Sequence, residues 1–202
     1  MGVIAGPAAP RSFIHAVDAD VTTLDAFITS DTYPALLQAI GNPVGRLLAA
    51  DELAAIQSLC QPSFGHLSGL QEARVLFDEI IRLLCPAPQP VRRDARVIRA
   101  MNLVEQYGFD ELSVAGLADA VNVSGSRLNA LFKRDLLCSP LEYIRSVCIW
   151  KAVPVLAKGG TLTDAAHQAG FHDLAHFSKS VFAITGSAPS ELAAGVLAMD
   201  FS

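Results

Sequence analysis

The feature that most constrains this chain is an internal duplication in its second half. Residues 113–140 and 161–189 share one pattern of apolar and small residues, offset by 48 positions and, after one inserted residue, by 49. The matched positions are Val114 with Leu162, Leu117 with Ala165, Ala118 with Ala166, Val121 with Ala169, Val123 with Phe171, Leu128 with Phe177, Phe132 with Val181 and Pro140 with Pro189. The same unit therefore occurs twice.

Each copy has the residues that a helix-turn-helix requires. Two helices that cross steeply need a small residue where their backbones approach, and Ala118 and Ala166 supply it. The tight turn needs a residue that tolerates positive φ, and Asn122 and Gly170 lie there. One copy alone is equally consistent with an ordinary helical hairpin. Two copies at matched spacing, joined by one capped helix, favour two helix-turn-helix units.

The second helix of each copy is expected to leave one face free to enter a major groove about 12 Å wide. In the first copy this face carries Ser126, Arg127, Asn129 and Lys133. In the second copy it carries Ala175, Ser178 and Lys179.

Capping residues predict where the helices of the second half begin and end. Helix starts are expected after Asp94, Ser113, Ser124, Ser139 and Thr161, and further helices from about Leu174 and at Pro189. Gly108 and Gly170 are expected to stop two of these helices. The linking helix from Ser139 should run to about Ala157. Pro154 lies inside it, so that helix either ends near Val153 or bends.

The segment from Cys85 to Pro90 has three prolines in its last five positions, which predicts a connector between two domains. We place a domain at 1–90 and a second at 91–202. The first shows short β-like runs at 13–14 and 21–28, followed by helical patterns around 33–40, 43–59 and 69–84. The predicted fold class is mainly α: two tandem helix-turn-helix subdomains joined by a long helix, after a small, mostly helical region with short β segments.

Composition narrows the setting. Hydrophobic residues make up 51% of the 202 positions, yet no apolar run is long enough to span a bilayer and the first residues do not resemble a signal peptide. The four cysteines show no metal-ligand spacing, which indicates reduced thiols and a cytoplasmic location. Residues 1–90 carry a net charge of −5, whereas 91–202 are neutral, so DNA binding would depend on locally placed cations.

Several stretches carry a family resemblance. They are residues 112–121 (LSVAGLADAV), 127–133 (RLNALFK), 138–140 (CSP), 162–166 (LTDAA) and 169–179 (AGFHDLAHFSK), followed by Gly186 and Pro189. Through them, residues 92–194 resemble the DNA-binding domain of the AraC/XylS family of transcription regulators, which covers about half of the chain.

The resemblance implies a sequence-specific regulator whose two recognition helices lie in successive major grooves of double-stranded DNA. By motif position, the residues that read bases would be Ser126, Arg127, Asn129, Ala175, Ser178 and Lys179. Lys133 and Arg134 are better placed for phosphate. RNA polymerase and a second copy of the chain are further candidate partners. The family's sensor barrel does not fit into residues 12–84, so region 1–90 resembles a truncated sensor and dimerisation region, with no effector identified.

Some residues depart from the family pattern. Leu137 stands where the family has glycine, Cys148 where an arginine is expected, and Val181 where the core has phenylalanine. From 159 to 202 the only Lys or Arg is Lys179, so the second copy should bind phosphate poorly. This favours an alternative hypothesis: a truncated interaction module that dimerises with or modulates a full-length regulator and itself binds DNA weakly.

Enzymatic chemistry finds little support. His167, His172 and His176 lie near one another in sequence, but no further ligand has suitable spacing for a metal. No phosphate-binding loop, nucleophile elbow or dinucleotide fingerprint occurs. We therefore expect no catalytic residue, no metal and no cofactor.

Overall fold

The computed structural model describes residues 3–5, 33–41, 45–61, 70–89, 92–185 and 188–191. The chain divides into two compact units, Met1–Gln89 and Pro90–Ser202.

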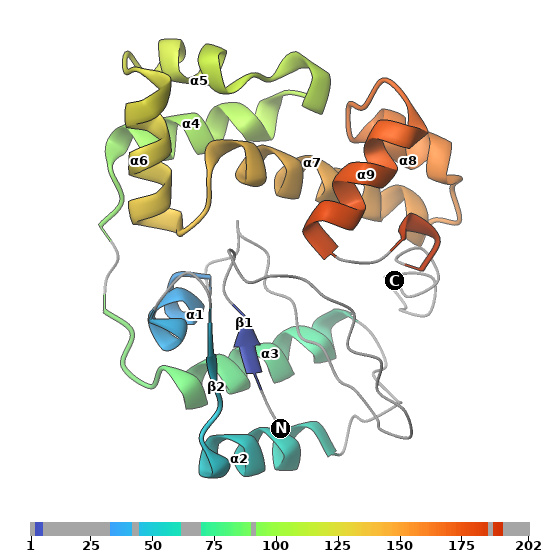
Figure 1. Ribbon diagram of the computed structural model, residues 1–202. Coiled ribbons are helices and arrows are strands. Elements are labelled where there is room, and N and C mark those ends of the chain that lie inside the picture. The colour runs from blue at the N-terminus through green and yellow to red at the C-terminus, as the bar shows by residue number, and fades with distance from the viewer. Residues whose placement is uncertain are drawn as a thin grey trace. The chain divides into compact units, whose positions relative to one another are not determined.

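The N-terminal unit combines a short β-ladder with helices (Figure 1). Strand β1 (Val3–Ala5) pairs antiparallel with β2 (Gly45–Leu47), and Ile4 lies opposite Arg46. The helices are α1 (Tyr33–Ile40), α2 (Ala50–Cys60) and α3 (Leu70–Leu84). The helix expected from about residue 43 thus begins only at Ala50, because the preceding residues are taken up by the ladder. The β-like runs at 13–14 and 21–28 lie outside the described residues.

Helices α2 and α3 pack through an apolar cluster. Cys60, Leu76 and Ile80 are buried at its centre, and Ile56, Leu59 and Leu84 border it. An ion pair stabilises the turn before α2, where both terminal nitrogens of the Arg46 guanidinium donate to the Glu52 carboxylate at 2.7 Å. These hydrogen bonds, with one from the Ala49 backbone, lower the pKa of Glu52 to about 2.

The regular elements of the C-terminal unit, among its described residues, are all helices. Its elements are α4 (Ala95–Gln106), the short 3₁₀ helix η2 (Phe109–Glu111), α5 (Val114–Ala120), α6 (Gly125–Leu136), α7 (Pro140–Ala157), α8 (Leu162–Gln168) and α9 (Leu174–Thr185). A further helical turn begins at Pro189, as the sequence predicts. Together with the N-terminal helices, these elements confirm the predicted mainly α fold class.

The predicted capping residues begin these helices. Asp94, Ser113, Ser124, Ser139 and Thr161 each accept a hydrogen bond from a backbone N–H in the first turn that follows. Ser139 and Glu142 form a reciprocal capping box, with Pro140 as the first helical residue. Because each cap satisfies a backbone N–H that the helix itself leaves without a partner, the helix starts are determined locally.

Helix α7 runs between the two repeats, with α4, α5 and α6 on one side and α8 and α9 on the other (Figure 1). Its residues Tyr143, Ile144, Cys148, Ile149 and Ala152 are almost completely buried. The helix continues through Pro154 to Ala157, so the early end near Val153 is wrong. Pro154 is exposed, which lets its ring remain in the helix without displacing a packed neighbour.

Candidate nucleic-acid interface

The two predicted turns have the same hydrogen-bond pattern. In the first repeat Val123 N–H donates to Ala118 O at 3.0 Å, and in the second Phe171 N–H donates to Ala166 O at 3.0 Å. Ala118 and Ala166 are 2% and 1% exposed, as expected for small residues where two helices cross. The turn residues Asn122 and Gly170 have φ of 56° and 77°. The predicted left-handed turns are therefore present in both repeats.

Helix α6 separates the predicted reading residues from the core. Its inward face is almost fully buried through Leu128, Leu131 and Phe132. Ser126, Arg127 and Lys133 are exposed on the opposite face, and Asn129 is half-buried. The Arg127 N–H donates to the Ser124 hydroxyl at 3.2 Å, which places this arginine in the first turn of the helix. The N-terminal residues of a recognition helix are those that contact base edges in the major groove.

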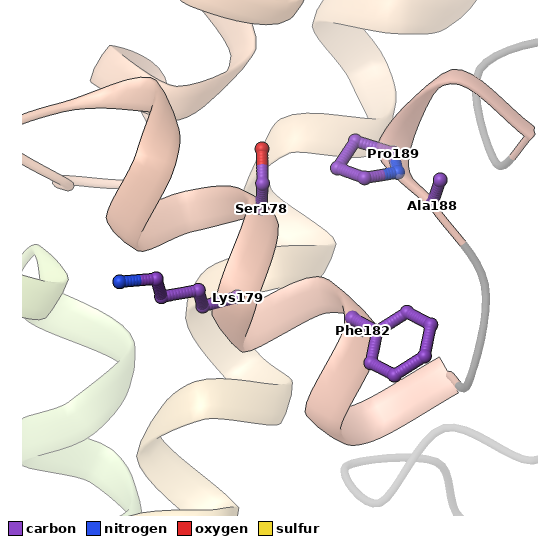
Figure 2. Close-up of a pocket in the computed structure, with 5 residues that line it drawn as sticks. All are labelled: Ser178, Lys179, Phe182, Ala188 and Pro189. Atoms are coloured by element: carbon purple, nitrogen blue, oxygen red, sulfur yellow. The ribbon is translucent and has the colours of Figure 1, made fainter.

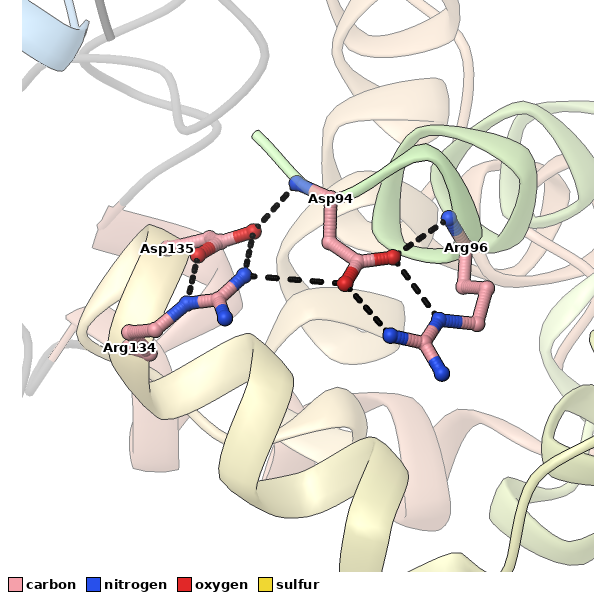
Figure 3. A network of polar contacts seen from close by, with 4 residues as sticks. All are labelled: Asp94, Arg96, Arg134 and Asp135. Atoms are coloured by element: carbon pink, nitrogen blue, oxygen red, sulfur yellow. Dashed lines mark hydrogen bonds and ion pairs between the residues drawn. The ribbon is translucent and has the colours of Figure 1, made fainter. Parts of the chain in front are cut away.

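Arg134, a predicted phosphate contact, lies in a network of two arginines and two aspartates (Figure 3). Its guanidinium donates to the Asp135 carboxylate at 2.6 Å and lies 3.8 Å from Asp94. Asp135 accepts the Asp94 backbone N–H at 2.8 Å, which joins the start of α4 to the end of α6. Hydrogen bonds from Arg96 hold the pKa of Asp94 well below its usual range. A phosphate at Arg134 would compete with these carboxylates, whereas Lys133 is exposed on the same helix.

The outer face of α9 presents the second set. Ala175 and Lys179 are exposed and Ser178 is half-buried, with its hydroxyl donating to Leu174 O at 2.7 Å. Phe177 and Val181 on the inward face are fully buried, so the smaller Val181 still occupies the core position. The Asp173 carboxylate accepts the His176 N–H at 2.7 Å and caps α9 as Ser124 caps α6. This hydrogen bond lowers the pKa of Asp173.

An aromatic residue also lies on α9. Phe182 is 52% exposed and, with Ser178, Lys179, Ala188 and Pro189, lines a shallow depression (Figure 2). In this view the Lys179 ammonium points away from the Phe182 ring. No signal in the sequence marks Phe182 as exposed, because an apolar residue in an amphipathic helix is expected to be buried. The outer face of α9 is thus less polar than that of α6.

Leu137 adopts the conformation that a glycine would normally supply. It ends α6 with φ of 56° and ψ of 15°, in the left-handed region. In the sequence, Leu137 is marked only as a departure from the glycine of the family pattern. The stop is formed with leucine, at the steric cost that a Cβ meets in this region.

The segment after α4 also differs from expectation. The sequence predicted a stop at Gly108 and no further element before α5. Instead, Phe109–Glu111 forms η2, which lies against the turn of the second repeat. No motif marks this contact, because the docking groups are mostly backbone atoms.

Metal binding and membrane insertion find no support in the part of the chain that the structure describes. Among those residues, no group of three or more His, Cys, Asp or Glu side chains could hold a metal ion. His176 instead packs edge-on against Phe109 and Phe171, at centroid distances of 5.0 and 5.3 Å. None of the described helices is long and apolar enough to cross a membrane. The four cysteines are free thiols.

Comparison with known proteins agrees with this geometry. The family described as a helix-turn-helix domain matches residues 117–195, a segment that contains most of both repeats. This segment is an AraC-type helix-turn-helix domain. The predicted resemblance to an AraC-type DNA-binding domain is therefore confirmed over the matched residues.

Individual relatives of the AraC-type domain match part of the chain. The lactose operon transcription activator of Staphylococcus xylosus is 37% identical over 82 residues, which are 40% of this chain and 29% of that protein. The C-terminal domain of AraT, a response regulator from Geobacillus stearothermophilus, has a TM-score of 0.49 at 19% identity, covering 55% of this chain and 93% of that one. The xylose-binding transcription activator xylR has a TM-score of 0.43 at 20% identity, covering 62% and 38%.

Proposed function

We propose that this protein is a transcription regulator that binds specific double-stranded DNA through α6 and α9. The observation that carries the proposal is the orientation of α6, whose apolar side is locked in the core while Ser126 and Arg127 are exposed at its start. Arginine can pair bidentately with guanine and asparagine with adenine, so Arg127 and Asn129 suit base reading. The transcription activator to which the chain is similar supports the same function.

The two repeats are expected to contribute unequally. The exposed face of α6 carries Arg127 and Lys133, whereas α9 offers Lys179 as its cation. Base discrimination should therefore come mainly from the first repeat, and Ala175 and Ser178 would add short-range contacts in the second. The alternative of a weakly binding interaction module is not favoured, because the matched relative is itself named as an activator.

We expect the regulator to act in the cytoplasm without catalytic activity, and RNA polymerase and a second copy of the chain are candidate partners. We propose the N-terminal unit, Met1–Gln89, as a sensor and dimerisation region. Its packed α2 and α3 supply a helical scaffold of the kind that such a role needs.

The test selects binding sequences from a random DNA library with the full chain and then compares Arg127→Ala with Arg99→Ala. Arg99 is exposed on α4, outside both repeats, and its loss changes net charge equally. Arg127→Ala should weaken binding by about 1–3 kcal/mol, roughly 5- to 150-fold, and relax one base position. Arg99→Ala should change affinity uniformly across sequences and by much less. Selection of no sequence, or equal effects of both variants, would refute the proposed reading face.

A further inference from the structure

The segment before α5 is bonded directly to the turn of the second repeat. Phe109 N–H donates to Ala169 O at 3.2 Å, and Asp110 N–H donates to Gly170 O at 2.9 Å. The Asp110 carboxylate in turn accepts the backbone N–H of His172. The N–H groups that η2 leaves free at its start thus donate to carbonyls of the turn that directly follows α8. We call Gly108–Asp110 together with Ala169–His172 the repeat joint.

Two glycines allow the backbones in the joint to approach so closely. A Cβ on Gly170 would overlap the Cα of Gly108 and lie 2.6 Å from the Phe109 nitrogen. A Cβ on Gly108 would lie 2.9 Å from the Gly170 Cα. These neighbours are backbone atoms, which cannot turn aside as a flexible side chain can. The joint therefore requires glycine at 170 for its contact as well as for its φ of 77°.

Aromatic rings close the joint on its inner side. Phe109 stacks on Phe171 with centroids 4.3 Å apart and planes 9° from parallel, and His176 meets both rings edge-on. Phe109 and Phe171 are 8% and 2% exposed. Since His176 lies in the first turns of α9, the stack connects η2 to the recognition helix as well as to the turn.

Helix α7 provides a second attachment at a different place. It packs against α8 and α9, and its Lys151 ammonium donates to Val104 O and Tyr107 O, at 3.2 and 2.6 Å, where α4 ends. A single helical contact would let one repeat roll about the axis of α7. The joint adds a direct attachment between η2 and the turn that follows α8, which restricts such rolling.

We propose that the repeat joint is a positioning device that holds α6 and α9 at one separation and rotation, so that the protein accepts half-sites at one spacing only. The inference rests on the proposed function. One inserted base pair moves the second half-site by about 3.4 Å along the DNA axis and by roughly 35° around it. Hydrogen bonds of 2.9–3.2 Å and a ring stack at 4.3 Å cannot extend by that amount and remain formed.

The first test needs no DNA. Residual dipolar couplings of the full chain should fit a single alignment tensor for α4–α6 and α8–α9 in the wild type. Gly170→Ala should require two tensors. Gly159→Ala is the matched control, because Gly159 has φ of 76° but a Cβ added there would meet no atom within 4 Å, so the variant carries the backbone strain without the clash. Two tensors in the wild type, or one tensor in Gly170→Ala, would overturn the proposal.

The second test measures affinity for DNA with two selected half-sites at the preferred spacing and with one base pair inserted. The affinity of the wild type and of Gly159→Ala for DNA should fall at least about tenfold when the base pair is inserted. Gly170→Ala should lose less than about threefold and should bind the inserted DNA more tightly than the wild type does. The ratio of the two affinities could also approach one because Gly170→Ala binds the DNA of preferred spacing more weakly and the inserted DNA no better. That result would mean that the second repeat no longer binds, and it would count against the proposal.

A milder pair of variants keeps the proposal testable if Gly170→Ala does not fold. Asp110→Ala removes the acceptor for His172 N–H, whereas Asp110→Asn keeps an oxygen there. Asp110→Ala should raise affinity for the inserted DNA over that of the wild type, and Asp110→Asn should restore the wild-type ratio. Asp119→Ala, at an exposed position on α5, controls for the lost charge. Equal behaviour of the three variants would overturn the role of Asp110. Failure to select any DNA would refute the proposed function, and the dipolar couplings would still decide on the joint.

Discussion

Substitution of Leu137 gives a direct measure of the strain at the end of α6. Leu137 is half-buried and has φ of 56°. In Leu137→Ala the Cβ remains in the left-handed region, but in Leu137→Gly it is removed. The comparison of these two variants cancels most of the lost side-chain packing, because both remove everything beyond Cβ.

The expected difference follows from two opposing terms. Glycine has no Cβ and so avoids the steric cost of the left-handed region, which stabilises the folded state of Leu137→Gly relative to Leu137→Ala by about 1–2 kcal/mol. The greater freedom of glycine in the unfolded chain offsets about 0.4–1 kcal/mol of this. Leu137→Gly should therefore be the more stable of the two variants by about 0.5–1 kcal/mol. Loss of the half-buried leucine costs both of them roughly 1 kcal/mol.

Equilibrium urea denaturation followed by the fluorescence of Trp150 makes the comparison. Trp150 is the one tryptophan of the sequence and lies on α7, so its emission reports on the C-terminal unit. Ala130→Gly, at an exposed position inside α6, provides the opposite case and should cost about 1 kcal/mol. The reasoning is refuted if Leu137→Ala is as stable as Leu137→Gly, because no left-handed strain would then exist at that residue.

Three further expectations concern the C-terminal unit. The pKa of Asp94 is lowered in the folded state, so its ion pairs stabilise the fold above the unfolded pKa of about 3.9, and this stabilisation is lost as the pH falls below that value. Asp94→Asn keeps a helix cap but removes the charge. The stability of this variant should therefore depend less on acid pH than that of the control Asp119→Asn. Pro154→Ala should stabilise the unit by about 2 kcal/mol in thermal unfolding followed by circular dichroism, since the helix regains a hydrogen bond. If the stability does not increase, Pro154 does not destabilise α7. Residues 91–202 should unfold cooperatively in isolation, and a molten fragment would contradict the proposed domain boundary.

The duplicated half could be predicted in detail because its signals are local. A capping serine or aspartate, a buried alanine and a turn residue with positive φ act within a few positions of one another. The sequence therefore predicted where α5, α6 and α8 begin and where both turns lie. The outward direction of Arg127 and Lys179 followed from the same periodicity.

Contacts between distant segments could not be predicted in this way. Backbone groups of Phe109 and Asp110 bind the second repeat, and backbone N–H groups have no side-chain signature. Arg134 stays a predicted phosphate contact, but the sequence did not predict that its guanidinium also lies 3.8 Å from Asp94, because Asp94 is 40 positions earlier in the chain. The predicted reading residues remain predictions.

The repeat joint constrains the turn residue of the second copy more than that of the first. Asn122 and Gly170 hold equivalent places with similar backbone conformation, but Gly170 has the backbone of Gly108 against it, whereas Asn122 is exposed. Glycine could replace asparagine at 122 at a modest cost in chain entropy. Asparagine at 170 would drive its Cβ into Gly108. The repeats can therefore not be exchanged, and a chimera carrying two copies of residues 113–140 should lose the fixed relation between its halves.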